Sequence, residues 1–129
     1  MHISNHEYYY LNKEGTFIVP LGVIDGSFSI SQFDQLTSLK NGPTKVKGPV
    51  FEIVGCHYLM SLQGCPEEVD GVFRLVNNSR LTSLKGITQK IGRRLEIGND
   101  NRLLDSSDLP TDLKQLTIGE RIPKEFFES

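Results

Sequence analysis

Hydrophobic positions recur along this chain with a period of 22 or 23 residues. The sequence LTSLK at residues 36–40 returns at residues 81–85, and a looser copy, LMSLQ, lies between them at residues 59–63. Self-similarity of this length is typical of a solenoid, in which each unit stacks on the next, rather than of a globular domain. We therefore expect a stack of repeated units around one elongated core.

Each unit also contains two apolar residues separated by one position, which is the periodicity of a β-strand. These pairs are Phe28/Ile30, Phe51/Ile53, Phe73/Leu75, Leu95/Ile97 and Leu116/Ile118. A single strand has no partner within its own unit, so it must pair with the equivalent strand of the next unit. The pattern predicts a mainly β fold with little helix, in which a single stack carries a parallel sheet of about five strands. The first residue of each pair should lie directly beside the first residue of the next pair in the sheet.

The segment that returns behind the sheet is expected to be extended or 3₁₀-helical. The repeated leucines, together with Val46, Val69 and Ile91, recur at positions that would fill the core behind the strands. Prolines in this segment oppose a long helix, because proline cannot donate a backbone hydrogen bond. Gly48 and Gly71 precede the strands, where a sharp bend or a close backbone approach favours glycine.

The two ends of the chain are predicted to cap one domain, residues 1–129, whose repeats span residues 20–118. Residues 1–19 contain a predicted β-hairpin, with aromatic and β-branched arms at 7–11 and 16–19 around a polar turn. At least one of Tyr8, Tyr9 and Tyr10 should stay partly exposed, either as part of the cap or as a binding site. Residues 119–129 form the predicted C-terminal cap.

The pattern F-x-L-x-x-N-x-x-L at residues 73–81 resembles the leucine-rich repeat. In that family an asparagine or cysteine after the strand bonds the backbone of the turn and stacks as a ladder, which here implies Cys56, Asn78 and Asp100. The repeats are also similar to short leucine-rich-repeat-like proteins carried by tailed bacteriophages and, more distantly, to those of secreted bacterial effectors. The resemblance covers about residues 20–118 and implies a fold rather than a role.

Side chains between the buried pairs should point outward and form a candidate binding surface on the sheet. This surface consists of Val50, Glu52, Val54, Val72, Arg74, Val76, Arg94 and Glu96. Glu52, Arg74 and Glu96 alternate in sign, which favours ion pairs between neighbouring strands. The four valines should not lie bare in water, so they indicate a partner surface or cover by the chain's own ends. Alternatively, valine occurs at these positions only because it favours β-strands, and the valines then indicate no binding surface.

A secondary column of the predicted surface contains Tyr58, Arg80 and Arg102. Two arginines on adjacent units repel each other unless an anion lies between them. That anion would be Asp100 or Glu120 of this chain, or an acidic or phosphorylated group of a partner.

The net charge of −2 hides an uneven distribution along the chain. Residues 1–35 and 103–129 each carry a net charge of −3, whereas residues 36–102 carry +4. A basic middle can steer an acidic partner, although a mixed solvated surface explains so small an excess equally simply.

Candidate chemistry is sparse, and we expect neither an enzyme nor a cofactor or metal site. Nucleotide-binding and hydrolase motifs are absent from the sequence. Cys56, His57 and Cys65 lie close together but lack a fourth ligand for zinc. Basic residues without interleaved aromatic ones argue against nucleic-acid binding. The chain shows neither a signal-peptide pattern nor an apolar run that could span a membrane, so we expect a soluble cytoplasmic protein with free thiols.

The favoured function is therefore a non-enzymatic protein–protein interaction module. The bacteriophage resemblance implies, as an expectation, that it binds and inhibits a host or defence protein. The alternative is a self-assembling structural protein, since exposed sheet edges tend to pair with copies of themselves. A small-molecule binder is the third and least favoured hypothesis. About five short strands offer little depth for a ligand pocket.

Overall fold

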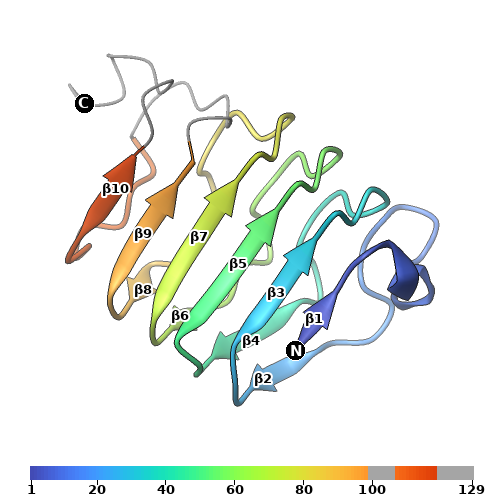
Figure 1. The fold of residues 1–129 in the computed structure, drawn as a ribbon, viewed down its shortest axis with the longest axis horizontal. Helices are drawn as coiled ribbons and strands as arrows, with labels where there is room; N and C mark the ends of the chain where they lie inside the picture. Colours follow the sequence, from blue (N-terminus) through green and yellow to red (C-terminus); the bar gives the residue numbers. More distant parts are fainter. Residues whose placement is uncertain (99–106, 119–129) are drawn as a thin grey trace.

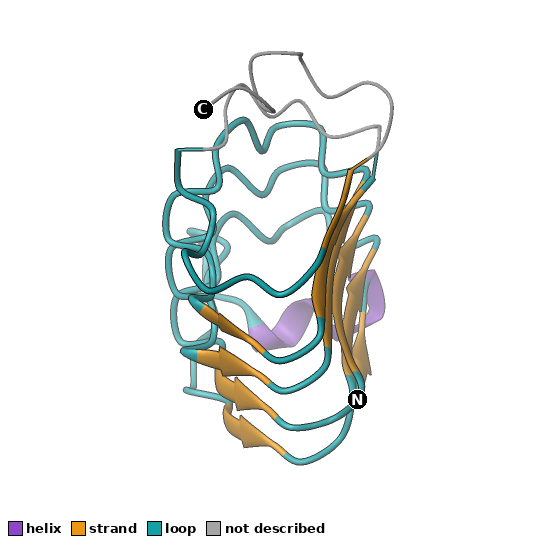
Figure 2. Cartoon of the chain, turned by 90° about the vertical axis from the view of Figure 1, so that its left-hand side faces the viewer, coloured by secondary structure: helices purple, strands orange, loops and turns teal. Residues whose placement is uncertain are grey.

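The computed structural model describes residues 1–98 and 107–118, which coil into a parallel β-solenoid (Figures 1 and 2). The larger sheet has six strands in the order β1 (His2–Ile3), β3 (Phe28–Ser31), β5 (Val50–Val54), β7 (Val72–Val76), β9 (Arg94–Ile97) and β10 (Leu116–Ile118). The smaller sheet has four strands in the order β2 (Gly22–Ile24), β4 (Pro43–Val46), β6 (Glu68–Val69) and β8 (Lys90–Ile91). Each coil of the chain forms one rung of the stack.

The register of the larger sheet is the one that the apolar pairs predict. Phe28 pairs with Phe51, Phe51 with Phe73, Phe73 with Leu95, and Leu95 with Leu116. The rings of Phe28 and Phe51 are stacked with centroids 5.8 Å apart, and those of Phe51 and Phe73 lie 4.8 Å apart. The mainly β solenoid fold is therefore confirmed, with β1 added at the N-terminal edge of the sheet.

The return segment is extended, as expected, and it also forms a sheet of its own. Ile24, Val46, Val69 and Ile91 pair in register on β2, β4, β6 and β8. Successive rungs bring the same extended segment to the same spacing, so backbone hydrogen bonds form between them wherever the strands stay parallel. This second sheet follows from the repeat. The prolines argued only against a long helix in this segment and did not indicate a sheet.

A ladder of backbone-bonding side chains begins after the strands of the larger sheet. The Oδ1 atom of buried Asn78 accepts the Cys56 N–H at 2.9 Å, and its Nδ2 donates to the Ile53 carbonyl at 2.9 Å. The side chain thus satisfies two backbone groups of the preceding rung, which is the bonding that the resemblance to leucine-rich repeats implied. Asp100, the next position of the expected ladder, lies outside the described residues.

The N-terminal cap differs from the predicted hairpin in its first arm. Residues Asn5–Tyr10 form a 3₁₀ helix, η1, rather than a strand. The side chain of Asn5 accepts the Asp34 N–H at 2.7 Å and donates to its carboxylate at 3.2 Å, which ties η1 to the corner after β3. The expected chain reversal is present, with one antiparallel bridge between Leu11 and Phe17. The C-terminal cap predicted at 119–129 lies outside the described residues.

Glycine corners set how closely successive rungs approach. A Cβ atom on Gly48 would overlap the backbone of Gly26 and Ser27, and one on Gly71 would overlap the backbone of Pro49. At Gly92 the obstacle is again the rung before, at Asp70. The absence of a side chain at these corners therefore lets successive rungs approach to about 4.8 Å, the distance between paired strands.

The substitution Gly71→Ala should lower the free energy of unfolding by about 2 kcal/mol or more, since the new methyl group must displace backbone. Gly26→Ala is the matched control, because Gly26 lies at the corner of the first rung and a Cβ there meets no atom within 4 Å. Its effect should stay within about 0.5 kcal/mol. Urea denaturation followed by circular dichroism measures both, and equal effects would contradict this account of the corners.

Candidate functional site

The predicted binding surface occupies the outer face of β5, β7 and β9. Val50 pairs with Val72, Glu52 with Arg74, and Val54 with Val76, while Arg74 continues to Glu96. The intervening residues, which include Phe51, Ile53, Phe73 and Leu75, are buried in the core. Strand alternation therefore brings all eight residues of the candidate surface onto one face, as expected.

The charged residues of this face form one network of ion pairs. Nη1 of Arg74 lies 3.0 Å from Oε2 of Glu52, and its Nε lies 2.7 Å from Oε2 of Glu96. Nε of Arg94 lies 2.6 Å from Oε1 of Glu96. Two carboxylates and two guanidinium groups thus balance one another, so the expected charge ladder is present and the surface has no net charge at its centre.

Glu96 is the most tightly held carboxylate of the network. Burial by itself raises the pKa of Glu96, but hydrogen bonds and charge attraction from Arg94 and then Arg74 outweigh it. The pKa is therefore lowered from its ordinary value of 4.5. A lowered pKa means that the network stabilises the folded state only while Glu96 is ionised.

The valines around this network are less exposed than the sequence suggested. Val72 is buried, with 6% of its surface accessible, and it lies in its column between Val50 and Arg94. Val50, Val54 and Val76 are half-buried. The apolar part of the surface is therefore a border of three partly accessible valines around the ion pairs, not a bare patch of four.

The N-terminal segment does not cover this face. β1 pairs with β3 at the edge of the sheet, and η1 lies beyond the ends of the first strands, away from β5 and β7 (Figure 1). Cover by the N-terminal hairpin, one of the explanations for the valines, is thus wrong for the described residues.

The secondary column contains a cation–π contact between two of its residues. The guanidinium carbon of Arg80 lies 4.5 Å from the ring centroid of Tyr58. Such a contact contributes about 0.5–1 kcal/mol at an exposed site and orients the guanidinium group over the aromatic ring. Arg102, Asp100 and Glu120 lie outside the described residues.

Cys56 and Cys65 are free thiols with little chemical reactivity expected. Burial raises the pKa of Cys56 to about 11 and that of Cys65 to about 12, so both remain protonated at neutral pH. His57 faces Ser79, with 3.4 Å between Nδ1 and Oγ. Within residues 1–98 and 107–118, no group of three or more acidic, cysteine or histidine side chains is arranged to hold a metal.

Further exposed apolar side chains occur within residues 8–23, the N-terminal tip of the stack. Tyr8 and Tyr9 are 61% and 63% exposed, which confirms that the tyrosines are not all used by the cap. Ile18, Val19 and Val23 are also more than half exposed. The sequence pattern did not single out these three residues, although an apolar segment beside an edge strand of the stack was a signal for exposure.

Comparison with protein-family models, curated proteins and solved structures finds no match to this chain. Its relationship to leucine-rich-repeat proteins of bacteriophages therefore stays a prediction. In the part of the chain that the structure describes, no helix has the length and hydrophobicity to cross a bilayer.

The ion-pair network predicts a pH-dependent contribution to stability. The variant Glu96→Gln should be about 1 kcal/mol less stable than the wild type at pH 7, since it breaks two partly exposed ion pairs. Because the folded-state pKa is lowered, this difference is fully present above the ordinary carboxyl pKa and disappears as pH falls through the lowered value.

Denaturation at pH 7 and near pH 3 measures this difference. Glu67→Gln is the matched control, because Glu67 is exposed and makes no ion pair with another described residue. An undiminished Glu96→Gln effect at the lower pH would show that the lost stability does not come from the charged form.

Proposed function

We propose that this chain is a non-enzymatic protein-interaction module that binds through the outer face of β5, β7 and β9. The observation that carries the proposal is the closed ion-pair network with its border of accessible valines. A surface whose charges already have partners can be covered by another protein without leaving a charge unpaired, and the valines then supply apolar contact area. Backbone hydrogen bonds between β5, β7 and β9 hold the strands of this face in place, so little conformational entropy is lost on binding.

The resemblance to bacteriophage proteins extends the proposal by analogy. On that basis, the partner is a host or defence protein in the cytoplasm, and binding inhibits it. This extension depends on the resemblance alone, whereas the proposed surface depends on the geometry.

Self-assembly is the second candidate function, and the N-terminal tip favours it. Aromatic and aliphatic side chains are exposed there, and exposed apolar surface commonly marks an association site. Tyrosine is also enriched at binding hot spots. Light scattering at dilute and concentrated protein separates the two candidates, since a monomer at every concentration excludes self-assembly through the tip.

The double variant Val54→Asp/Val76→Asp should abolish partner capture, because it places two unpaired carboxylates in the contact area. Affinity capture from lysate of the native host, followed by mass spectrometry, identifies the partner, and titration with that partner should show at least about a tenfold loss of affinity. Val19→Asp/Val23→Asp is the matched control, since it makes the same change at two exposed valines of the tip.

Circular dichroism and thermal unfolding must show that both variants fold. If the first variant unfolds, the single variant Val76→Lys tests the same contact. Capture lost with the control variant but retained with the sheet variant would place the binding surface at the tip and contradict the proposal.

A further inference from the structure

One segment of the chain contains basic side chains and no acidic ones. Residues 71–95 have no aspartate or glutamate, and their basic residues are Arg74, Arg80, Lys85, Lys90, Arg93 and Arg94. The segment is about one rung long and extends from the corner before β7 into β9. Arg74 and Arg94 find carboxylates on β5 and β9, in the network of the outer face. Any carboxylate that pairs with the remaining cations must come from another part of the chain or from a partner.

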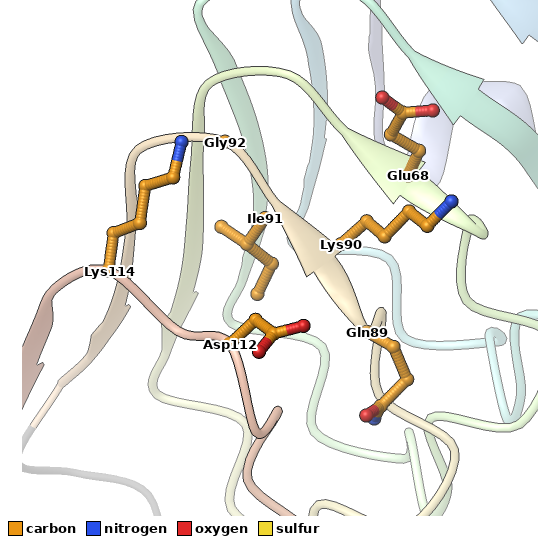
Figure 3. A pocket seen from close by; sticks show the side chains of 7 residues that line it. All are labelled: Glu68, Gln89, Lys90, Ile91, Gly92, Asp112 and Lys114. Atoms are coloured by element: carbon orange, nitrogen blue, oxygen red, sulfur yellow. The ribbon is translucent and has the colours of Figure 1, made fainter.

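Lys90 shares its surroundings with carboxylates of other rungs. A hollow of about 210 Å³ beside β8 is lined by Lys90 and Lys114 and also by Glu68 and Asp112 (Figure 3). Glu68 is the register neighbour of Lys90 on β6. Two positive and two negative side chains balance one another at this hollow, so it has no excess charge to offer to a ligand.

Arg80 differs from these cations because an aromatic ring holds it. Its guanidinium carbon lies 4.5 Å from the ring centroid of Tyr58, and among the described residues it forms no ion pair with a carboxylate. A ring contact leaves the guanidinium N–H groups that do not face the ring available to an acceptor. Tyr58 therefore orients a charged donor without neutralising its charge.

The corner around this contact has polar groups but no negative side chain. Ser79 and His57, which precede Arg80 and Tyr58, form the adjacent contact between the same two rungs, with 3.4 Å between Oγ and Nδ1. Residues 53–66, which include the corner and the return segment of the preceding rung, contain no aspartate or glutamate. The Arg80 side chain thus lies where neither of these two rungs supplies a carboxylate.

This corner adjoins the proposed interaction face. Tyr58 follows β5 and Arg80 follows β7, in the loops that extend beyond the C-terminal ends of these strands (Figure 1). Both side chains are exposed. Tyrosine and arginine are among the residue types most enriched at the hot spots of protein interfaces. A partner that covers the ends of β5 and β7 would therefore meet an oriented, unneutralised guanidinium group.

We propose that Tyr58 and Arg80 form an anion-binding corner of the interface, which receives an oxyanion of the partner protein. The oxyanion is a carboxylate or a phosphate monoester, because a guanidinium group recognises both through paired N–H donors. The inference deepens the proposed function and rests on it for the identity of the partner. Binding of a small oxyanion at the corner is measurable without that partner.

The test uses the full chain, labelled with ¹⁵N, and two small probes, acetyl-phosphoserine methylamide and acetyl-glutamate methylamide, at constant ionic strength. The Arg80 Nε–H resonance should shift saturably with at least one probe, with a dissociation constant of about 30 mM or below. Arg93 is the internal control, since it is exposed and has neither a ring contact nor an ion pair among the described residues. The comparison of the two probes distinguishes a phosphate from a carboxylate.

Two variants separate an oriented guanidinium group from general positive charge. Tyr58→Leu retains every charge but removes the ring, and it should weaken binding by about threefold or more. Lys85→Gln is the matched control, because it removes one exposed charge of the same acid-free segment and should leave binding at Arg80 nearly unchanged. Circular dichroism verifies that both variants fold.

Equal shifts at Arg80 and Arg93, a shift that does not saturate, or unchanged binding by Tyr58→Leu would each overturn the inference. Binding that appears only after Asp100→Asn or Glu120→Gln would also overturn it, because a carboxylate of this chain would then occupy the guanidinium group. The variants of the sheet face test the valine border separately, so failure at the corner is distinguishable from failure of the proposed function.

Discussion

Backbone hydrogen bonding between rungs is the interaction on which the rest of this structure depends. It requires successive coils to lie about 4.8 Å apart, the distance between paired strands, around their whole circumference. At the corners, a side chain would collide with the backbone of the preceding coil. Glycine at positions 48, 71 and 92 removes the obstacle. The stacked phenylalanines, the Asn78 ladder and the ion pairs of the outer face then follow, because each of them joins residues that the register has already placed side by side.

The period of the repeat was sufficient to predict the architecture. Apolar residues two apart fix both the strand and its buried face, and a one-residue error in register would have exposed them. The first arm of the cap was not predictable in the same way. Its tyrosines favour a strand by propensity, but side-chain bonds from Asn5 to Asp34 hold the segment in a 3₁₀ helix. Those contacts depend on residues 29 positions apart, which no local pattern reveals.

In the candidate surface, strand alternation determines which side chains share a face, whereas packing determines how much of each side chain stays accessible. Alternation correctly placed Glu52, Arg74 and Glu96 in one column and therefore predicted their ion pairs. It gave no measure of how much of each neighbouring side chain would remain accessible, so Val72 was expected on the surface and is buried. Within the described residues, the end of the smaller sheet at β8 was also beyond prediction, because residues 111–114 depart from the pattern of the preceding rungs.

The left-handed residues at the corners have a consequence for how this fold can vary. The rungs of β3, β5 and β7 each have one after that strand, at Gln32, Gly55 and Asn77, and another follows the repeated leucines, at Asn41, Gly64 and Gly86. These residues turn the chain within a rung and depend little on how many rungs precede them. Duplication of one whole unit would therefore lengthen the molecule by about 4.8 Å and widen its outer face by one strand, without refolding its neighbours. Such a scaffold can change the size of its contact area through gene duplication alone.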